Sequence, residues 1–181
     1  MKGYKFLATL LIAISICSFS YAQQYTPEAS GSKIGFGIKN LGVTVHGAFS
    51  GLAGEITFDP KDPSKSSFNV HVDSKSINTD NDMRDNHLRK EEFFDVEKYP
   101  HLTFVSESIT GSGKSFNVKG KLTIKGVTKE VSFKFTATPE GDAYTFKGSF
   151  ELNRRDFGVG GSSITMSDKV NVELVVVAKK K

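Results

Sequence analysis

Residues 32–40 have the sequence SKIGFGIKN, in which apolar and polar or small residues alternate. Ile34, Phe36 and Ile38 fall on one side of an extended chain, and their neighbours fall on the other. A period of two is the mark of a β-strand with one buried face. The stretch therefore predicts a strand that turns an apolar face toward a core and ends at the turn Asn40-Leu41-Gly42.

The same alternation recurs along the rest of the chain, in about eight or nine stretches. Its apolar members are Val43, Val45, Phe49; Ile56, Phe58; Phe68, Val70, Val72; Leu102, Phe104; Phe116, Val118, Leu122, Ile124; Val131, Phe133, Phe135; Tyr144, Phe146, Phe150, Leu152; and Val170, Val172, Leu174, Val176. Short connections between short strands favour antiparallel pairing. We predict one all-β domain, an eight-stranded barrel, because closure removes exposed strand edges. A two-sheet sandwich is the alternative.

One segment, from Asp80 to Glu97, interrupts the alternation with charged helix formers. We predict a helix over residues 81–90, capped by Thr79 or Asp80, followed by a turn that places Phe93 and Phe94 against the domain. Tyr99-Pro100 ends the segment. This short helical insertion is interpreted as a lid or side cover of the barrel.

The first 22 residues predict a cleaved signal peptide. Lys2 and Lys5 precede an apolar run, and Ser20-Tyr21-Ala22 places small residues before the cleavage position. The mature domain would span residues 23–181 and contain no cysteine, because Cys17 leaves with the signal. We therefore expect a bacterial periplasmic or secreted protein, soluble after cleavage. The only dense basic run is at residues 179–181, so nucleic acid is not an expected partner.

The interior of an eight-stranded barrel can be filled by side chains or can hold one small ligand. The chain has 15 Phe and no Trp, and this aromatic surplus favours a ligand-binding interior. The apolar residues predicted to line it are Phe36, Ile38, Val45, Phe49, Phe58, Val70, Val72, Phe93, Phe94, Phe104, Phe116, Leu122, Phe133, Phe135, Phe146, Phe150 and Phe157.

Polar candidates for a ligand head group are Arg84, His87 and Arg154. Arg84 and His87 are three residues apart, so they share a face of the predicted helix. The alternative is a solvated helix face, or an Arg–Asp pair that holds the lid to the barrel. None of the four histidines has the spacing of zinc ligands, and no Gly-x-Ser-x-Gly pattern occurs. We predict no catalytic residue, no metal and no cofactor.

The sequence resembles the YceI-like family of bacterial periplasmic proteins, which are regarded as polyisoprenoid-binding. The resemblance rests on residues 32–40, residues 84–88 (RDNHL), residues 93–96 (FFDV), residues 120–128 (GKLTIKGVT) and residues 153–158 (NRRDFG), in this order. It implies a lipocalin-like, extended eight-stranded antiparallel barrel with a long isoprenoid or fatty-acid-like molecule in an apolar tunnel. It leaves open a homodimer and a quinone-linked membrane partner.

The function expected from these features is periplasmic binding, carriage or sequestration of a long apolar lipid. Two alternatives remain at this point. One is a structural or stress-related partner-binding protein whose barrel is filled by its own side chains. The other is a lipid-modifying enzyme in which His87 and Asp85 supply acid–base chemistry.

Overall fold

The structure, a computed structural model, describes residues 22–181. Antiparallel pairing joins all the strands of this part of the chain. The strands are β1 (Gln23–Asn40), β2 (Val43–Phe49), β3 (Ala53–Phe58), β4 (Ser67–Asp73), β5 (His101–Ser112), β6 (Ser115–Ile124), β7 (Val127–Glu140), β8 (Ala143–Asn153) and β9 (Met166–Lys180). The predicted signal peptide falls almost wholly outside the described residues. The helix α1 (Asp82–Leu88) and the 3-10 turns η1 (Pro63–Lys65), η2 (Ser74–Ser76) and η3 (Arg154–Phe157) complete the fold.

The sheet closes on itself because β1 pairs with β9 on one side and with β2 and β3 on the other. The two halves of β1 have different partners: Gln23 lies opposite Phe58 of β3, whereas Ile34 lies opposite Phe49 of β2. β2 and β3 therefore share one position around the wall. The result is a closed barrel with eight strand positions, so the predicted eight-stranded antiparallel barrel is confirmed and the sandwich is excluded.

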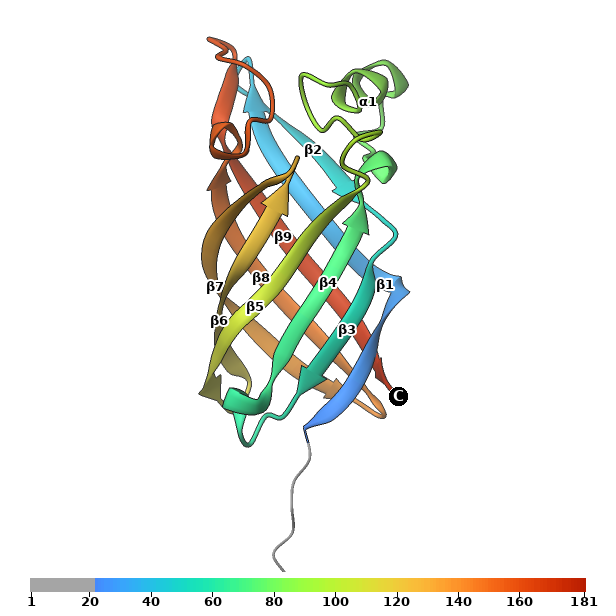
Figure 1. The fold of residues 1–181 in the computed structure, drawn as a ribbon, viewed down its shortest axis with the longest axis vertical. Coiled ribbons are helices and arrows are strands. Elements are labelled where there is room, and N and C mark those ends of the chain that lie inside the picture. Colours follow the sequence, from blue (N-terminus) through green and yellow to red (C-terminus); the bar gives the residue numbers. More distant parts are fainter. Residues whose placement is uncertain (1–21) are drawn as a thin grey trace, which may run out of the picture.

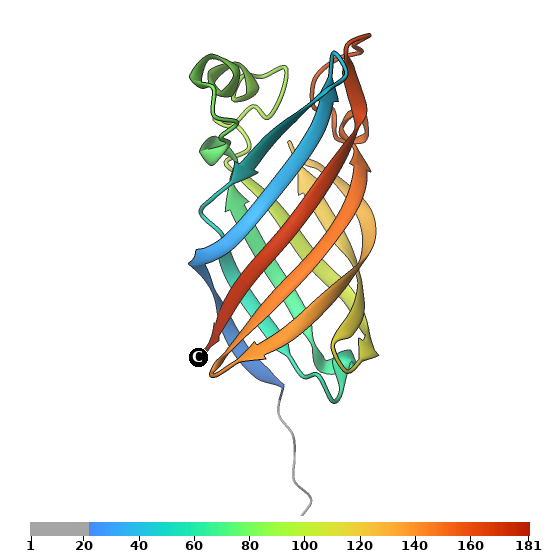
Figure 2. The ribbon, with the colours of Figure 1, turned by 180° about the vertical axis from the view of Figure 1, so that it is seen from behind.

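The barrel is elongated, and its two ends differ (Figure 1). The β3–β4 connection, the β5–β6 and β7–β8 hairpins and the C-terminus lie at one end, which we call the closed end. The β1–β2 turn, α1, the β6–β7 turn and the β8–β9 loop lie at the other, which we call the open end; the view from behind shows the same division (Figure 2).

The helix α1 is shorter than predicted, and its cap is a different residue. Asn81 caps it by accepting a hydrogen bond from the Arg84 backbone N–H at 2.9 Å. The prediction of Thr79 or Asp80 as the cap was wrong. Thr79 instead bonds Asp85, and Asp80 has a positive φ of 58°, outside the extended conformation of a cap. Turns continue from Lys90 toward Tyr99, as expected.

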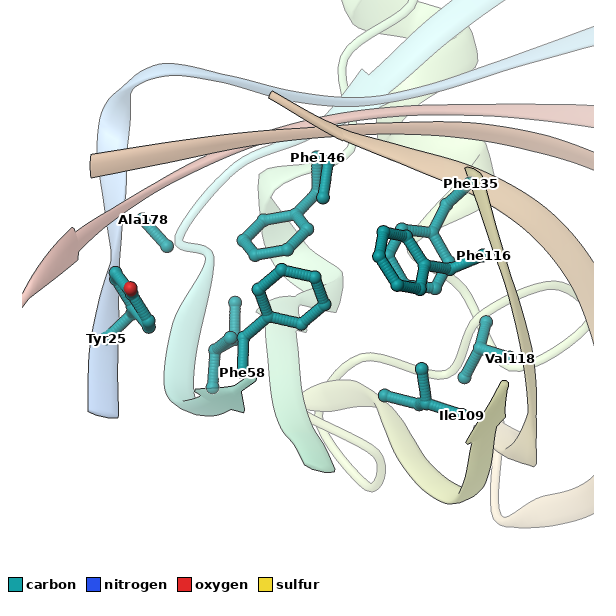
Figure 3. Close-up of a cluster of buried hydrophobic side chains, with 10 residues drawn as sticks. Tyr25, Phe58, Ile109, Phe116, Val118, Phe135, Phe146 and Ala178 are labelled. Carbon is teal, nitrogen blue, oxygen red and sulfur yellow. The ribbon is translucent and has the colours of Figure 1, made fainter. Parts of the chain in front are cut away.

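Aromatic side chains fill the closed end. The ring centroid of Phe58 lies 5.2 Å from that of Phe116 and 5.1 Å from that of Phe146, both in edge contact. Figure 3 shows these rings, with Phe135, turned toward one another inside the barrel. Burying one such side chain contributes about 1.5–3 kcal/mol, and each aromatic pair about 0.5–1.5 kcal/mol more. The closed end is thus the main stabilising core.

Candidate functional site: an apolar cavity behind the open end

A cavity of about 270 Å³ occupies the barrel between the closed-end cluster and the open end. All nine strands contribute to its wall, and its surface is almost wholly apolar. An engineered cavity of about 150 Å³ binds benzene, so by proportion this one has room for about ten carbon atoms. The barrel is therefore not filled by its own side chains, and the space suits one apolar chain.

The structure places all the predicted lining residues around this cavity except Phe58 and Phe116. Those two belong to the closed-end cluster, where they are 1% and 0% exposed. Their height in the barrel explains the difference. Phe58 pairs with the first residue of β1, and Phe116 lies near the β5–β6 hairpin. The predicted tunnel is accordingly a cavity that ends on an aromatic floor.

Several lining residues were not selected from the sequence. Phe68 contributes to the floor, and Val170, Val172, Leu174 and Val176 of β9 form one side of the wall. All of them carry the alternation of a strand with one inward face. A simple rule, that every inward position of every strand faces the same space, would have found them.

Two glycines shape the wall by letting aromatic rings lie against the backbone. A Cβ at Gly47 would lie 2.4 Å from the Phe36 ring, and one at Gly120 would lie 2.7 Å from the Phe104 ring. Gly47 lies directly opposite Phe36 on the neighbouring strand, and Gly120 lies diagonal to Phe104, so each ring lies over its glycine. The wall is smooth and tightly packed at these points, which leaves the free space on the barrel axis.

Polar groups gather where the cavity meets the open end. Arg84 of α1 donates from Nε to Thr79 Oγ1 and from Nη2 to the Thr79 carbonyl, both at 2.7 Å. Thr79 in turn donates its backbone N–H at 2.9 Å and its hydroxyl at 2.5 Å to Asp85 Oδ1. Thr79 and Asp85 are buried, so this network fixes the guanidinium at the cavity wall. Among residues 22–181, Arg84 Nη1 has no hydrogen-bond partner.

Asn40, at the end of β1, was not a sequence-based candidate. Its side chain lines the cavity, and within the described residues its buried Oδ1 accepts no hydrogen bond. An unpartnered buried acceptor costs free energy, about 1–3 kcal/mol, unless a donor reaches it. The cavity mouth thus offers one cationic donor, Arg84, and one neutral acceptor, Asn40.

The other two head-group candidates are placed differently. His87 is exposed, packs on the Phe93 ring at 5.0 Å between centroids, and does not line the cavity. Arg154 does line it but is 4% exposed, and its guanidinium is occupied by the chain itself. It donates to the carbonyls of Ser167, Val159 and Gly161 and to Asp168 Oδ1, at 2.8–3.0 Å.

Burial lowers the pKa of Arg154 from its ordinary value, and the nearby Asp168 carboxylate opposes this shift. The side chain remains a cation, because an arginine pKa starts far above neutral pH. Its hydrogen bonds tie η3 to the β8–β9 loop and to the start of β9. The geometry favours a structural role for Arg154 at the edge of the cavity.

Within residues 22–181, no group of three or more His, Cys, Asp or Glu side chains is arranged to hold a metal ion. His71 and His101 do form a pair, with ring centroids 4.6 Å apart, on adjacent strands. No helix within residues 22–181 has the length and apolar character needed to cross a membrane.

Comparison with known proteins agrees with this architecture. A UPF0312 protein of Pseudomonas aeruginosa strain LESB58 is 36% identical over 166 residues, covering 86% of this chain and 87% of that protein. Protein YceI of Salmonella agona is 34% identical over 166 residues, covering 88% and 86%. Each is a relative of nearly the same length.

Solved structures share the fold. BcnA of Burkholderia cenocepacia superposes with a TM-score of 0.80 at 30% identity, over 84% of this chain and 99% of BcnA. A polyisoprenoid binding domain from Saccharophagus degradans superposes with a TM-score of 0.72 at 17% identity, over 87% and 98%. The profile of the YceI-like domain matches residues 25–178. The chain therefore belongs to the YceI-like family.

Proposed function

We propose that this protein binds the apolar tail of a lipid, isoprenoid or fatty-acid-like, inside the barrel and carries or sequesters it. The observation that supports this most directly is the apolar cavity of about 270 Å³ behind a polar mouth. The Saccharophagus degradans domain with the same fold is described as polyisoprenoid binding, which agrees with the proposal. The cavity left between the side chains speaks against a barrel filled by its own side chains.

The energetics are marginal for a tail that only fills the cavity. Ten methylene groups contribute about 8 kcal/mol at about 0.8 kcal/mol each. Association costs about 4–15 kcal/mol, and a single chain held by a preformed cavity falls toward the lower part of that range. A tail of about ten carbons is then close to the threshold of useful affinity. A longer tail gains affinity only if the aromatic floor moves.

The polar mouth favours a head group that accepts a hydrogen bond from Arg84 and donates one to Asn40. The cation suits a carboxylate or phosphate, and the neutral acceptor suits a hydroxyl or a protonated acid. A lipid-modifying enzyme is less well supported. Asp85 is occupied by Thr79, and the His87 side chain lies outside the cavity.

The proposed place of action is the bacterial periplasm, reached by export through the signal sequence in residues 1–22. The proposal includes cleavage after Ala22. Sequencing the N-terminus of protein recovered from the periplasmic fraction of its host tests both points. A chain that starts at Met1 and stays with the cytoplasm would contradict them.

Native mass spectrometry of protein purified from its own host tests lipid binding. We expect adducts whose mass matches a single-chain lipid. Phe133, whose ring stacks on Phe150 at 4.8 Å, provides the test position inside the wall. The Phe133→Asp variant should lose the adduct, because a carboxylate in this wall is not solvated. Val105→Asp, on the outer face of β5, is the matched control and should keep it. Consistently empty wild-type protein that takes up no added lipid would disprove the proposal.

A further inference from the structure

Large apolar side chains are exposed at the open end and are rare elsewhere on the described surface. Leu41, Val43, Met83, Val127 and Ile164 are the exposed large apolar residues of this end, at 75%, 67%, 82%, 37% and 105%. They belong to the β1–β2 turn, the start of β2, α1, the start of β7 and the β8–β9 loop. Figures 1 and 2 place all these elements around the same end of the barrel. Within residues 22–181, only Val105 is a comparable exposed residue away from it.

Leu41 is unfavourable for the fold in two respects. Leu41 and Gly42 have φ values of 51° and 80°, so both central positions of the turn are left-handed. Such two-residue hairpin turns favour Asn, Asp or Gly, because other side chains clash with the backbone. The leucine also leaves its side chain in water. An asparagine would suit the local structure better, so the leucine serves something outside the barrel.

The β1–β2 turn and the β8–β9 loop form one lip beside the mouth, because the Leu41 N–H donates to the Thr165 carbonyl at 2.9 Å. This lip, residues 40–45 and 158–167, contains no ionisable side chain. In the whole chain 24% of the residues are charged, so the lip is strongly depleted of charge. An uncharged lip that projects single aliphatic side chains fits the interfacial region of a bilayer.

We propose that the lip docks the protein on the surface of a lipid bilayer, with Leu41 and Ile164 inserted and the cavity mouth facing the membrane. This inference rests on the proposed function, since it provides the path by which a tail passes between bilayer and cavity. The helix α1, which carries the exposed Met83, lies at the same end of the barrel as the lip (Figure 1). Because the lip is uncharged, docking should be as strong on neutral phosphatidylcholine vesicles as on anionic ones, and insensitive to salt.

Tryptophan fluorescence tests the orientation, because the chain has no tryptophan of its own. Leu41→Trp and Val105→Trp are matched single-tryptophan variants at the lip and on the barrel wall. With phosphatidylcholine vesicles, the emission of Leu41→Trp should shift to the blue and be quenched by lipids brominated near the head of the acyl chain. The emission of Val105→Trp should do neither. Equal responses from both variants, or none from Leu41→Trp, would overturn the proposal.

Vesicle flotation tests the contribution of the lip. The double variant Leu41→Asn/Ile164→Ser should reduce the vesicle partition coefficient at least tenfold, whereas Val105→Ser should leave it within twofold. Neither lip residue lines the cavity, so affinity for a monomeric fluorescent fatty acid should also stay within twofold. Asn suits the turn, so unfolding would not explain the loss. Intact mass must show the same N-terminus in all samples, so that differences in signal-sequence cleavage do not account for differences in vesicle binding.

The two proposals can fail separately. Wild-type protein that binds the fluorescent fatty acid but does not float with vesicles disproves docking and leaves the cavity function standing. Wild-type protein that floats but binds no fatty acid disproves the cavity function. A second copy is the other occupant that an apolar lip could accept. If sedimentation velocity without vesicles shows a dimer that the double variant dissociates, the lip is a protein interface and the bilayer proposal is wrong.

Discussion

The aromatic floor sets the length of tail that the cavity accepts, and Phe135 is the residue to change. Its side chain lines the cavity, and its ring stacks on Phe116 of the closed-end cluster at 5.4 Å between centroids. Phe135→Ala removes about six carbon atoms from the floor, so space for about ten ligand carbons becomes space for about sixteen. The variant should therefore bind longer tails than the wild type.

Affinity should rise with chain length until the cavity is full. Each buried methylene contributes about 0.8 kcal/mol, or about fourfold in Kd. For wild-type protein the rise should stop near ten carbons; for Phe135→Ala it should continue to about sixteen. The assay is titration calorimetry with linear carboxylates of graded length, each below its micelle concentration. The same plateau in both proteins, or an affinity that does not depend on chain length, would refute the idea that the aromatic floor limits tail length.

Stability provides the matched control. Phe135→Ala should cost about 3–5 kcal/mol of unfolding free energy, within the 5–15 kcal/mol typical of a domain. Phe116→Ala should cost a similar amount, because Phe116 is fully buried. Its void, however, lies below the Phe135 ring and is not added to the cavity. Phe116→Ala should therefore lose stability without shifting the chain-length plateau.

Three further predictions concern stability. Arg154→Ala should lower the free energy of unfolding in urea by about 3 kcal/mol, because buried carbonyls and Asp168 lose a charged donor. Arg155 is an exposed neighbour, and Arg155→Ala should change the free energy of unfolding by less than about 0.5 kcal/mol. The pKa of Tyr25 is raised, first by burial and then by the nearby Tyr144 phenol and Asp59 carboxylate. The folded state therefore favours the neutral form of the Tyr25 phenol. Stability should thus decline as pH rises above about 10, the pKa of a free tyrosine. Tyr25→Phe should reduce that decline, as measured by urea midpoints across this pH range. An equal decline in both proteins would contradict the prediction. Gly120→Ala should cost about 1–3 kcal/mol in thermal or urea unfolding, because its Cβ would lie 2.5 Å from the Val105 carbonyl; an unchanged midpoint would count against the tight wall.

The strands were predictable because their signal is local. Ile34, Phe36 and Ile38 carry the period of two in their own sequence, and so do the other strands. The sharing of one barrel position by β2 and β3 was not predictable in this way. It depends on which half of β1 pairs with which later segment, such as Gln23 with Phe58. The first half of β1, before residue 32, was not predicted as a strand.

The site was predictable in its chemistry and less so in its depth. Inward direction follows from alternation, but height along the barrel axis follows from register between strands far apart in the chain. Phe58 and Phe133 therefore looked equivalent, although one lies in the closed end and the other in the cavity wall. Asn40 was missed because an asparagine before a glycine-containing turn is common. Only the absence of a partner around its buried oxygen in residues 22–181 distinguishes it.

Height along the axis also separates what the apolar side chains do. Phe58 and Phe116 are fully buried outside the cavity, so changing them alters stability and leaves a ligand unaffected. Leu41, in contrast, does not stabilise the fold, since its left-handed conformation and its exposed side chain are both unfavourable. A barrel can retain such a residue only if the closed end supplies stability to spare. The well-packed closed end therefore permits an open end with an exposed apolar lip and, within residues 22–181, an unpartnered acceptor and a guanidinium nitrogen without a hydrogen bond, which are the features a lipid would use.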